Sequence, residues 1–161
     1  MPELPEVEIT ARRLGAALAG SKVESALATG VATLKTFDPP LDALEERSVE
    51  GVGRVGKMLR PDFSGDLSLL IHLMSAGRLQ LFRERASLKD RRSRVLVRLA
   101  DGRELRLREF GTRQSAWAKL LQSEQVAEDE MVATLGPEAW PAPPPEIFAE
   151  AIDQPHHLHP L

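Results

Sequence analysis

The residues best suited to covalent chemistry lie at the amino terminus of this 161-residue chain, where Pro2 is followed by Glu3. Removal of Met1 would expose the secondary amine of Pro2, and an α-amino group titrates closer to neutral pH than a lysine side chain does. An uncharged amine of this kind can attack a carbonyl carbon and form an iminium. The Glu3 carboxylate could then move protons to and from the adduct. The alternative is structural, because proline and glutamate are both favoured in the first turn of a helix.

Three residues further along the chain suggest contacts with a nucleic acid. Lys57 follows a predicted strand and a glycine, so its amine could reach a backbone phosphate or an opened sugar. Met74 and Phe110 lie in or beside turns, where an apolar side chain has little core to fill. Exposed apolar side chains flanked by arginines can wedge into a base stack and fill the gap left by an extruded nucleotide. The alternatives are a solvated lysine at a strand end and ordinary core packing for the other two.

The net charge of −3 is distributed unevenly. Lys and Arg minus Asp and Glu give 5 − 9 = −4 for residues 1–53, 15 − 7 = +8 for residues 54–113, and 1 − 8 = −7 for residues 114–161. A basic segment within an acidic protein can bind phosphates, because neutralising them releases counterions. A solvated strand face is the alternative interpretation.

The elements that must position these residues follow from the periodicity of apolar side chains. A helix is predicted from residue 5 to about residue 19, because one face is apolar and Gly20 follows it. A short helical piece is expected at 41–46. Alternating or continuous apolar runs predict at least six strands without intervening helices. These strands are expected at 22–27, 49–55, 67–73, 78–82, 94–99 and 104–107.

The remainder of the chain is predicted to be helical. A helical stretch is expected from about residue 115, a second helix at 124–135 with Ser123 as its N-cap, and a third at 146–152 after a proline-rich connector. The fold class is therefore α+β. An antiparallel β-sandwich or barrel is flanked by an amino-terminal helix and carboxy-terminal helices.

Composition predicts neither a metal site nor a cofactor in this chain. It contains no cysteine, so a disulfide framework and a cysteine-ligated zinc site are both excluded within it. His156, His157 and His159 lie near the end without carboxylate or thiolate partners at ligand spacing, so we interpret them as a tail. No apolar run approaches the roughly 20 residues of a membrane span, and we expect no contact with a membrane.

The opening residues are very similar to the amino terminus of the formamidopyrimidine-DNA glycosylase and endonuclease VIII family. Four further matches follow in the family's order. The matching segments are Pro2–Glu8, Gly56–Lys57, His72–Ser75 with Gly77, Arg108 with Phe110–Gly111, and Leu135–Glu138. The resemblance covers the whole chain, which in turn covers only the amino-terminal part of the family's length.

This resemblance implies a base-excision-repair DNA glycosylase and AP lyase that removes oxidised bases. The first residues resemble the branch that acts on oxidised purines such as 8-oxoguanine and formamidopyrimidines. By resemblance, Pro2 forms a Schiff base with the damaged nucleoside, Glu3 assists proton transfer and Lys57 acts in the elimination. The implied partner is damaged double-stranded DNA, and we expect a monomer in the bacterial cytoplasm, associated with the nucleoid.

The resemblance also implies which residues contact DNA. Met74, Arg108 and Phe110 match the trio that fills the gap left by the flipped nucleotide, and Arg92 falls where the family has a DNA-contacting histidine. The family's usual Asp-Pro-Arg-Arg-Phe-Gly is altered at residues 105–111, Leu-Arg-Leu-Arg-Glu-Phe-Gly, where the proline and the second arginine are missing. As phosphate contacts, the arginines would position the protein rather than read sequence.

The family's length sets the expected domain organisation. Residues 1–134 would form the catalytic β-sandwich domain with its amino-terminal helix. Residues 135–161 would form a linker and the start of a helix-two-turn-helix domain, whose zinc finger would lie beyond residue 161.

Two other functions remain open. One is a catalytically impaired DNA-binding remnant. The other is an amino-terminal-proline tautomerase, against which the long run of strands argues.

Overall fold

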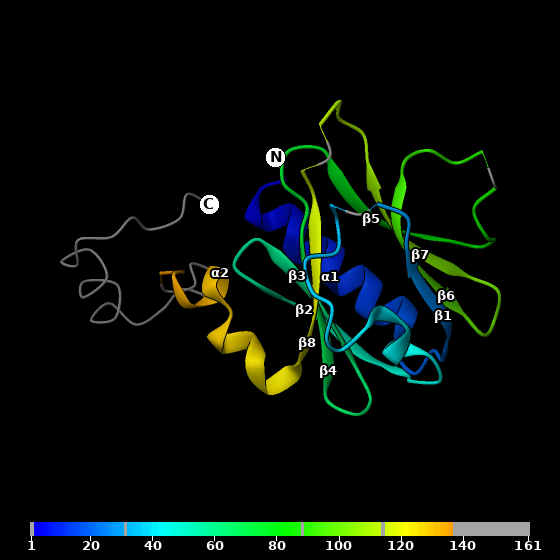
Figure 1. The fold of residues 1–161 in the computed structure, drawn as a ribbon, viewed down its shortest axis with the longest axis horizontal. Helices are drawn as coiled ribbons and strands as arrows, with labels where there is room; N and C mark the ends of the chain where they lie inside the picture. Colours follow the sequence, from blue (N-terminus) through cyan, green and yellow to red (C-terminus); the bar gives the residue numbers. More distant parts are fainter. Residues whose placement is uncertain (1, 31, 88, 114, 137–161) are drawn as a thin grey trace.

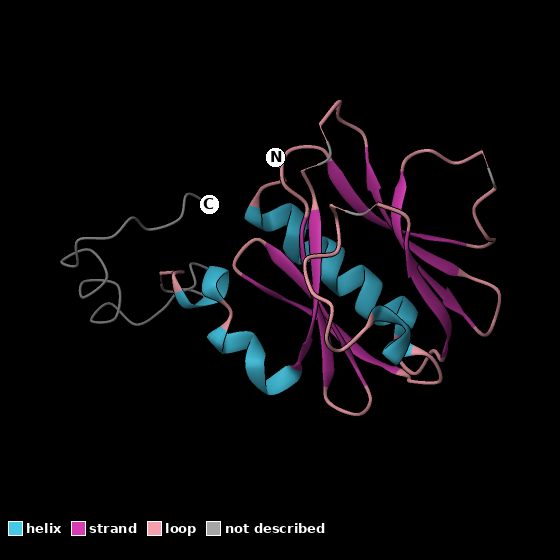
Figure 2. Cartoon of the chain, in the orientation of Figure 1, coloured by secondary structure: helices cyan, strands magenta, loops and turns pink. Residues whose placement is uncertain are grey.

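The computed structural model describes residues 2–30, 32–87, 89–113 and 115–136. Within these ranges, eight strands form two antiparallel four-stranded sheets, and the longest helix, α1 (Leu4–Leu18), packs against β2 and β3 (Figures 1 and 2). One sheet has the order β1-β6-β7-β5 and the other β2-β3-β4-β8. The strands are β1 (Val23–Ala28), β2 (Val49–Val55), β3 (Met58–Phe63), β4 (Leu67–His72), β5 (Gly77–Phe82), β6 (Ser93–Leu99), β7 (Glu104–Glu109) and β8 (Trp117–Gln122).

The core is formed by the apolar face of α1 and by apolar side chains of both sheets. The face predicted from the helical period is buried, with Val7, Ala11, Leu14 and Leu18 in the core. Strand β4 is buried at every position, which explains why its sequence is mostly apolar and does not alternate with exposed polar residues. Because α1 is held along its length, its first turn is a fixed platform for the residues that precede it.

The predicted fold class is confirmed, and so are the predicted amino-terminal helix and the six predicted strands, with small shifts at their ends. The helical piece at 41–46 is a short 3-10 helix, Leu41–Leu44. Strand β3 was not predicted. Pro61 lies in its middle, and proline cannot donate a hydrogen bond to a sheet ladder. The register accommodates this, because β3 pairs with β4 at residues 58–59 and 62–63 but not between them.

The prediction of a helix from about residue 115 is wrong. Residues 117–122 form strand β8, which pairs along its whole length with β4. Ala118 and Leu120 are both buried in the core, as expected for alternate residues of a strand. The same apolar residues also fit the spacing of a helix, which is why the prediction failed. The unpaired edge of β4 provides a partner that the local pattern could not reveal.

The helix predicted at 124–135 is broken into two short pieces. A 3-10 helix spans Ser123–Glu128, and α2 spans only Glu130–Ala133. Asp129, not Ser123, caps α2, because its side chain accepts a hydrogen bond from the Met131 amide at 3.0 Å. An ion pair of 2.9 Å between Asp129 and Lys119 ties this cap to β8.

Two predictions about the carboxy-terminal segment are not tested. The helix at 146–152 and the three-histidine tail lie outside the described residues. The domain boundary at residue 134 also stays a prediction. Within the described ranges, no helix has the length and apolar character needed to cross a bilayer.

Candidate active site

The amino terminus is held in place by the first turn of α1. Pro2 and Leu4 are buried, whereas about half of the Glu3 side chain is exposed. The Glu3 amide donates a hydrogen bond of 3.1 Å to the Glu6 carboxylate, and the Glu3 carbonyl accepts one from Val7. A carboxylate three residues into the helix thereby fixes the backbone next to Pro2.

Lys57 lies against this terminus, although it is distant in sequence. Its Nζ atom lies 3.4 Å from Oε2 of Glu3, and the lysine is only 9% exposed. An ammonium group, a carboxylate and the residue whose amine could act as a nucleophile therefore meet at one place. A cation of this kind can hold an anionic oxygen, while the carboxylate can exchange protons with a reacting group.

The turn between β2 and β3 presents Lys57. Gly56 has a φ of 58°, in the left-handed region that favours glycine. Arg54 donates to Oε1 of Glu8 at 3.0 Å and to the Gly56 carbonyl at 3.3 Å, and its own side chain is 6% exposed. The turn is thus anchored to α1, the helix that carries the amino terminus. Leu135 packs on the other side, because a side chain at Gly56 would lie 3.0 Å from it.

The turn after β4 brings Met74 to the same end of the molecule. His72 pairs with Met58, the neighbour of Lys57, so the end of β4 adjoins the lysine turn. The Met74 amide donates a hydrogen bond of 3.0 Å to Nδ1 of the buried His72. Met74 has a φ of 53°, which is uncommon for a residue with a side chain. This strained, half-buried position is consistent with a functional side chain rather than with core packing.

The loop after β7 adjoins the Met74 turn. The Phe110 amide donates to the Ala76 carbonyl at 3.0 Å, and the Phe110 side chain is 43% exposed. The guanidinium groups of Arg108 and Arg92 each lie 4.9 Å from the centre of its ring. Arg108 also lies 5.3 Å from the ring of Phe82. A half-exposed aromatic ring is therefore in contact with two guanidinium groups, and apolar side chains of this kind can insert between bases.

The altered motif at residues 105–111 has a structural explanation. Glu109, which occupies the position of the missing second arginine, is buried and accepts hydrogen bonds from the amides of Ser115 and Ala116 at 3.2 and 2.9 Å. It closes the base of the loop that carries Phe110.

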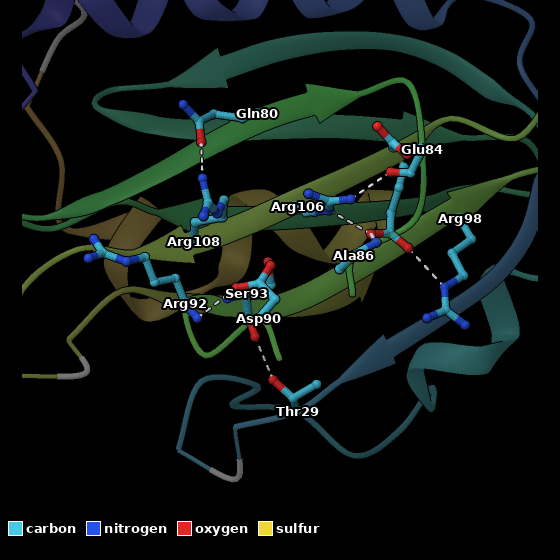
Figure 3. A network of polar contacts seen from close by, with 11 residues as sticks. Thr29, Gln80, Glu84, Ala86, Asp90, Arg92, Ser93, Arg98, Arg106 and Arg108 are labelled. Atoms are coloured by element: carbon cyan, nitrogen blue, oxygen red, sulfur yellow. Dashed lines mark hydrogen bonds and ion pairs between the residues drawn. The ribbon is translucent and has the colours of Figure 1, made fainter. Parts of the chain in front are cut away.

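Arg106 stacks on Phe82 at 3.9 Å. Figure 3 shows Arg106 and Arg108 extending from β7 over the outer face of the sheet, with Arg108 reaching Gln80.

All seven residues predicted for the site therefore lie in two adjoining groups. Pro2, Glu3 and Lys57 form the first, and Met74, Arg92, Arg108 and Phe110 form the second. Their roles stay predictions. Within the parts of the chain that the structure covers, no group of three or more His, Cys, Asp or Glu side chains could hold a metal ion.

A protein-family model for the formamidopyrimidine-DNA glycosylase N-terminal domain matches residues 1–113, well over half of the chain. This chain belongs to that family. Formamidopyrimidine-DNA glycosylases of Lactococcus lactis subsp. cremoris and Geobacter metallireducens are 31% and 36% identical to it over 141 and 145 residues. Each alignment covers 86% of the chain and 50% of the relative, so the chain spans about half the length of these curated relatives.

Solved structures of formamidopyrimidine-DNA glycosylase share the fold. The Lactococcus lactis enzyme bound non-covalently to DNA with an AP site matches with a TM-score of 0.77 and 28% identity, over 94% of this chain and 55% of that chain. The same organism's enzyme in complex with DNA containing Fapy-dG matches with a TM-score of 0.74 and 26% identity, over 84% and 50%.

Some positioning residues of this glycosylase-family domain were missed from the sequence. The ion pair between Glu8 and Arg54 and the capping of loop amides by Glu109 both join residues whose spacing carries no local signal. His72 also supports the site from behind, because it is buried and its Nδ1 accepts the hydrogen bond from the Met74 amide. The sequence feature that could have indicated this role is the position of His72, two residues before Met74.

Proposed function

We propose that the protein is a DNA glycosylase and AP lyase that removes oxidised bases from double-stranded DNA through a Schiff base on Pro2. The observation that carries the proposal is the meeting of Glu3 and Lys57, 3.4 Å apart, beside the buried Pro2. The family match and the shared fold support it. With Met1 removed, the α-amino group is secondary and titrates near neutral pH, so a fraction is available as a nucleophile.

The chemistry assigns a separate task to each residue. The Pro2 nitrogen attacks C1′, the glycosidic bond breaks, and its electrons leave with the base, which takes up a proton. Opening of the sugar then needs a proton at the ring oxygen, which the half-exposed Glu3 carboxyl can deliver. Loss of a proton from C2′ of the resulting iminium expels the 3′ phosphate. Lys57, a cation in a largely buried position, can stabilise the leaving phosphate.

Extrusion of the target nucleotide is assigned to the second group of residues. Flipping costs a few kcal/mol, which inserted side chains and phosphate contacts must offset. Met74 and Phe110 can fill the vacated space, while Arg108 and Arg92 stack on the Phe110 ring and remain able to contact phosphates. These two contacts hold the Phe110 ring in the free protein.

We assign oxidised purines, such as 8-oxoguanine and formamidopyrimidines, as the substrate class. The support is the name shared by the curated relatives and the Fapy-dG-containing DNA in one similar complex. We further propose that the protein acts as a monomer on nucleoid DNA in the bacterial cytoplasm. Sedimentation of the free protein and of its DNA complex would test the monomer.

Borohydride trapping with an abasic-site duplex tests the proposal. Protein whose intact mass shows that Met1 is absent should form a covalent adduct. Protein that retains Met1 is the matched control, because its Pro2 nitrogen is an amide and cannot attack. If the trimmed protein binds the duplex but forms no adduct, the chain is a DNA-binding remnant without lyase chemistry, and the proposal is overturned.

A further inference from the structure

The segment between β5 and β6 is unusually basic, and apart from Arg92 at its end it has no role in the function proposed above. We define the basic loop as residues 83–87 and 89–92, the described part of this connection (Figure 1). Residues 83–92 contain five arginines and lysines and two acids, a net charge of 5 − 2 = +3. The rest of the chain has a net charge of −3 − 3 = −6. The charge is therefore concentrated in one short connection.

Two carboxylates hold the loop, one at each end. At its start, the fully buried Glu104 accepts hydrogen bonds from the Ala86 amide at 2.9 Å, from Arg98 at 2.9 Å and from Arg106 at 2.6 Å. Arg106 in turn donates to the Glu84 carbonyl at 2.5 Å. Figure 3 shows these contacts joining the loop to the outer face of the sheet. The backbone of the first half of the loop is therefore anchored to β6 and β7.

At the other end of the loop, Asp90 forms a compact turn. It accepts hydrogen bonds from the Arg92 amide at 2.9 Å and from the Ser93 hydroxyl at 2.6 Å. The hydroxyl of Thr29 donates to the Ser93 carbonyl at 2.7 Å, which ties the turn to the end of β1. The backbone that carries the cations of the loop is therefore held by hydrogen bonds at both ends.

The cations of the loop differ in whether they already have an acidic partner. Arg85 pairs with Glu24. Arg83, Lys89 and Arg91 are exposed, and among the described residues none of them has an ion pair or a side-chain hydrogen bond to an acid. Three exposed positive charges of this kind favour an anionic partner.

The loop is continuous with the candidate DNA-binding residues. The Glu109 amide donates to the Arg92 carbonyl at 2.9 Å, and the Arg92 guanidinium stacks on Phe110. The loop then runs back along the sheet from this insertion residue to Phe82 at the far end of β5. A duplex engaged at Phe110 would thus have its backbone beside further cations.

We infer that the basic loop is a second phosphate-binding surface, which holds duplex DNA away from the lesion through Arg83, Lys89 and Arg91. The carboxylates of Glu104 and Asp90 position it. The inference rests on the DNA binding in the proposed function, but it concerns the undamaged duplex and does not require Pro2 chemistry. Such contacts carry no sequence information, and they should appear as salt-dependent affinity.

The test is the salt dependence of binding to a short undamaged duplex, measured by fluorescence anisotropy. Each lost phosphate contact makes the slope of log K against log salt concentration shallower by about 0.9. Lys89→Gln combined with Arg91→Gln should therefore reduce the slope by about 1 to 2. The matched control is Arg13→Gln combined with Lys35→Gln, which removes the same charge from exposed positions outside the loop and should leave the slope unchanged. Equal slopes for the two double variants would overturn the inference.

A second variant separates positioning from bulk charge. Glu104→Gln removes no cation and makes the protein one unit more positive, so simple attraction would tighten binding. Loss of positioning should instead weaken binding and make the slope shallower, with the folded state checked by circular dichroism. Tighter binding by Glu104→Gln would overturn the positioning role. Borohydride adducts report the Pro2 chemistry independently. If the loop variants change the salt dependence of binding but the parent protein forms no adduct, the proposed function is overturned and this inference is retained.

Discussion

Arg54 Nε lies 3.0 Å from Glu8 Oε1, and this largely buried ion pair joins the helix that carries Pro2 to the turn that carries Lys57. It couples two parts of the site that are more than 40 residues apart, since Glu8 and Arg54 are separated by 46 residues. The pair thereby maintains the geometry in which Glu3 and Lys57 meet.

Glu8→Gln should therefore lower both stability and adduct formation. The largely buried Arg54 would lose its ion pair with Glu8, and we expect the free energy of unfolding to fall by about 1–3 kcal/mol in urea titrations. Glu46→Gln is the control, because it breaks an exposed pair with Lys22 and should change stability by less than about 1 kcal/mol. A Glu8→Gln protein as stable and as reactive as the parent would contradict this coupling.

Lys57 should matter for chemistry more than for folding. Lys57→Met removes the cation beside Glu3 but keeps an unbranched apolar stem, so we expect adduct formation to slow by about a hundredfold or more. Lys57→Arg retains the charge with a bulkier head group and should recover part of the rate. The measurement is the single-turnover rate of borohydride trapping at saturating protein. Equal rates for Lys57→Met and the parent protein would exclude a catalytic role.

Gly77 should be required for the Met74 turn. A Cβ atom at this position would lie 2.5 Å from the Leu73 carbonyl oxygen and 2.8 Å from the Ala116 side chain. We expect Gly77→Ala to destabilise the fold by about 1–3 kcal/mol, visible as a lower Tm. Gly51→Ala is the matched control, because a Cβ there meets nothing within 4 Å. It should leave Tm unchanged or raise it slightly.

Phe82 should order Arg108 ahead of DNA binding. Its ring lies 3.9 Å from the Arg106 guanidinium and 5.3 Å from that of Arg108. Phe82→Leu keeps an apolar side chain but removes the cation–π contacts, each of which is expected to contribute about 0.5–1 kcal/mol. Affinity for an abasic-site duplex should fall by about three- to fivefold, measured by anisotropy at fixed salt. Unchanged affinity would mean that Phe82 does not position Arg108, whose other contacts are with Gln80 and the Phe110 ring.

Glu104 should make stability depend on pH in acid. Burial disfavours the charged form, but hydrogen bonds from Arg106 and Arg98 outweigh it and hold the pKa of Glu104 below its ordinary value of 4.5. The unfolded chain therefore binds a proton at higher pH than the folded chain does. The stabilisation is fully present above about pH 4.5 and is lost as pH falls through the lower folded-state pKa.

The free energy of unfolding should accordingly decline below about pH 4.5 in the parent protein and decline less in Glu104→Gln. At neutral pH this variant should be less stable by about 2–4 kcal/mol, because two arginines lose a buried counter-ion. Urea titrations across the acid range provide both numbers. Parallel pH profiles would show that Glu104 does not account for the acid dependence.

The sequence by itself determined the parts of this protein that depend on local periodicity and on short motifs. The apolar face of α1, six strands and the identity of Pro2, Glu3 and Lys57 as candidates could all be inferred from neighbouring residues. The family was also recognisable, because its motifs are short contiguous segments. Local steric and hydrophobic patterns are sufficient for such features.

Only the tertiary structure decided how distant residues meet. Trp117–Gln122 is a strand because β4 offers an unpaired edge, although the segment's own spacing suggested a helix. Lys57 reaches Glu3 because the Arg54 ion pair and the left-handed Gly56 aim the turn at α1. Glu109 replaces an arginine with a carboxylate that binds loop amides. Each of these three features depends on a partner from another part of the chain. The energy of pairing distant segments cannot be read from the local sequence pattern of either segment.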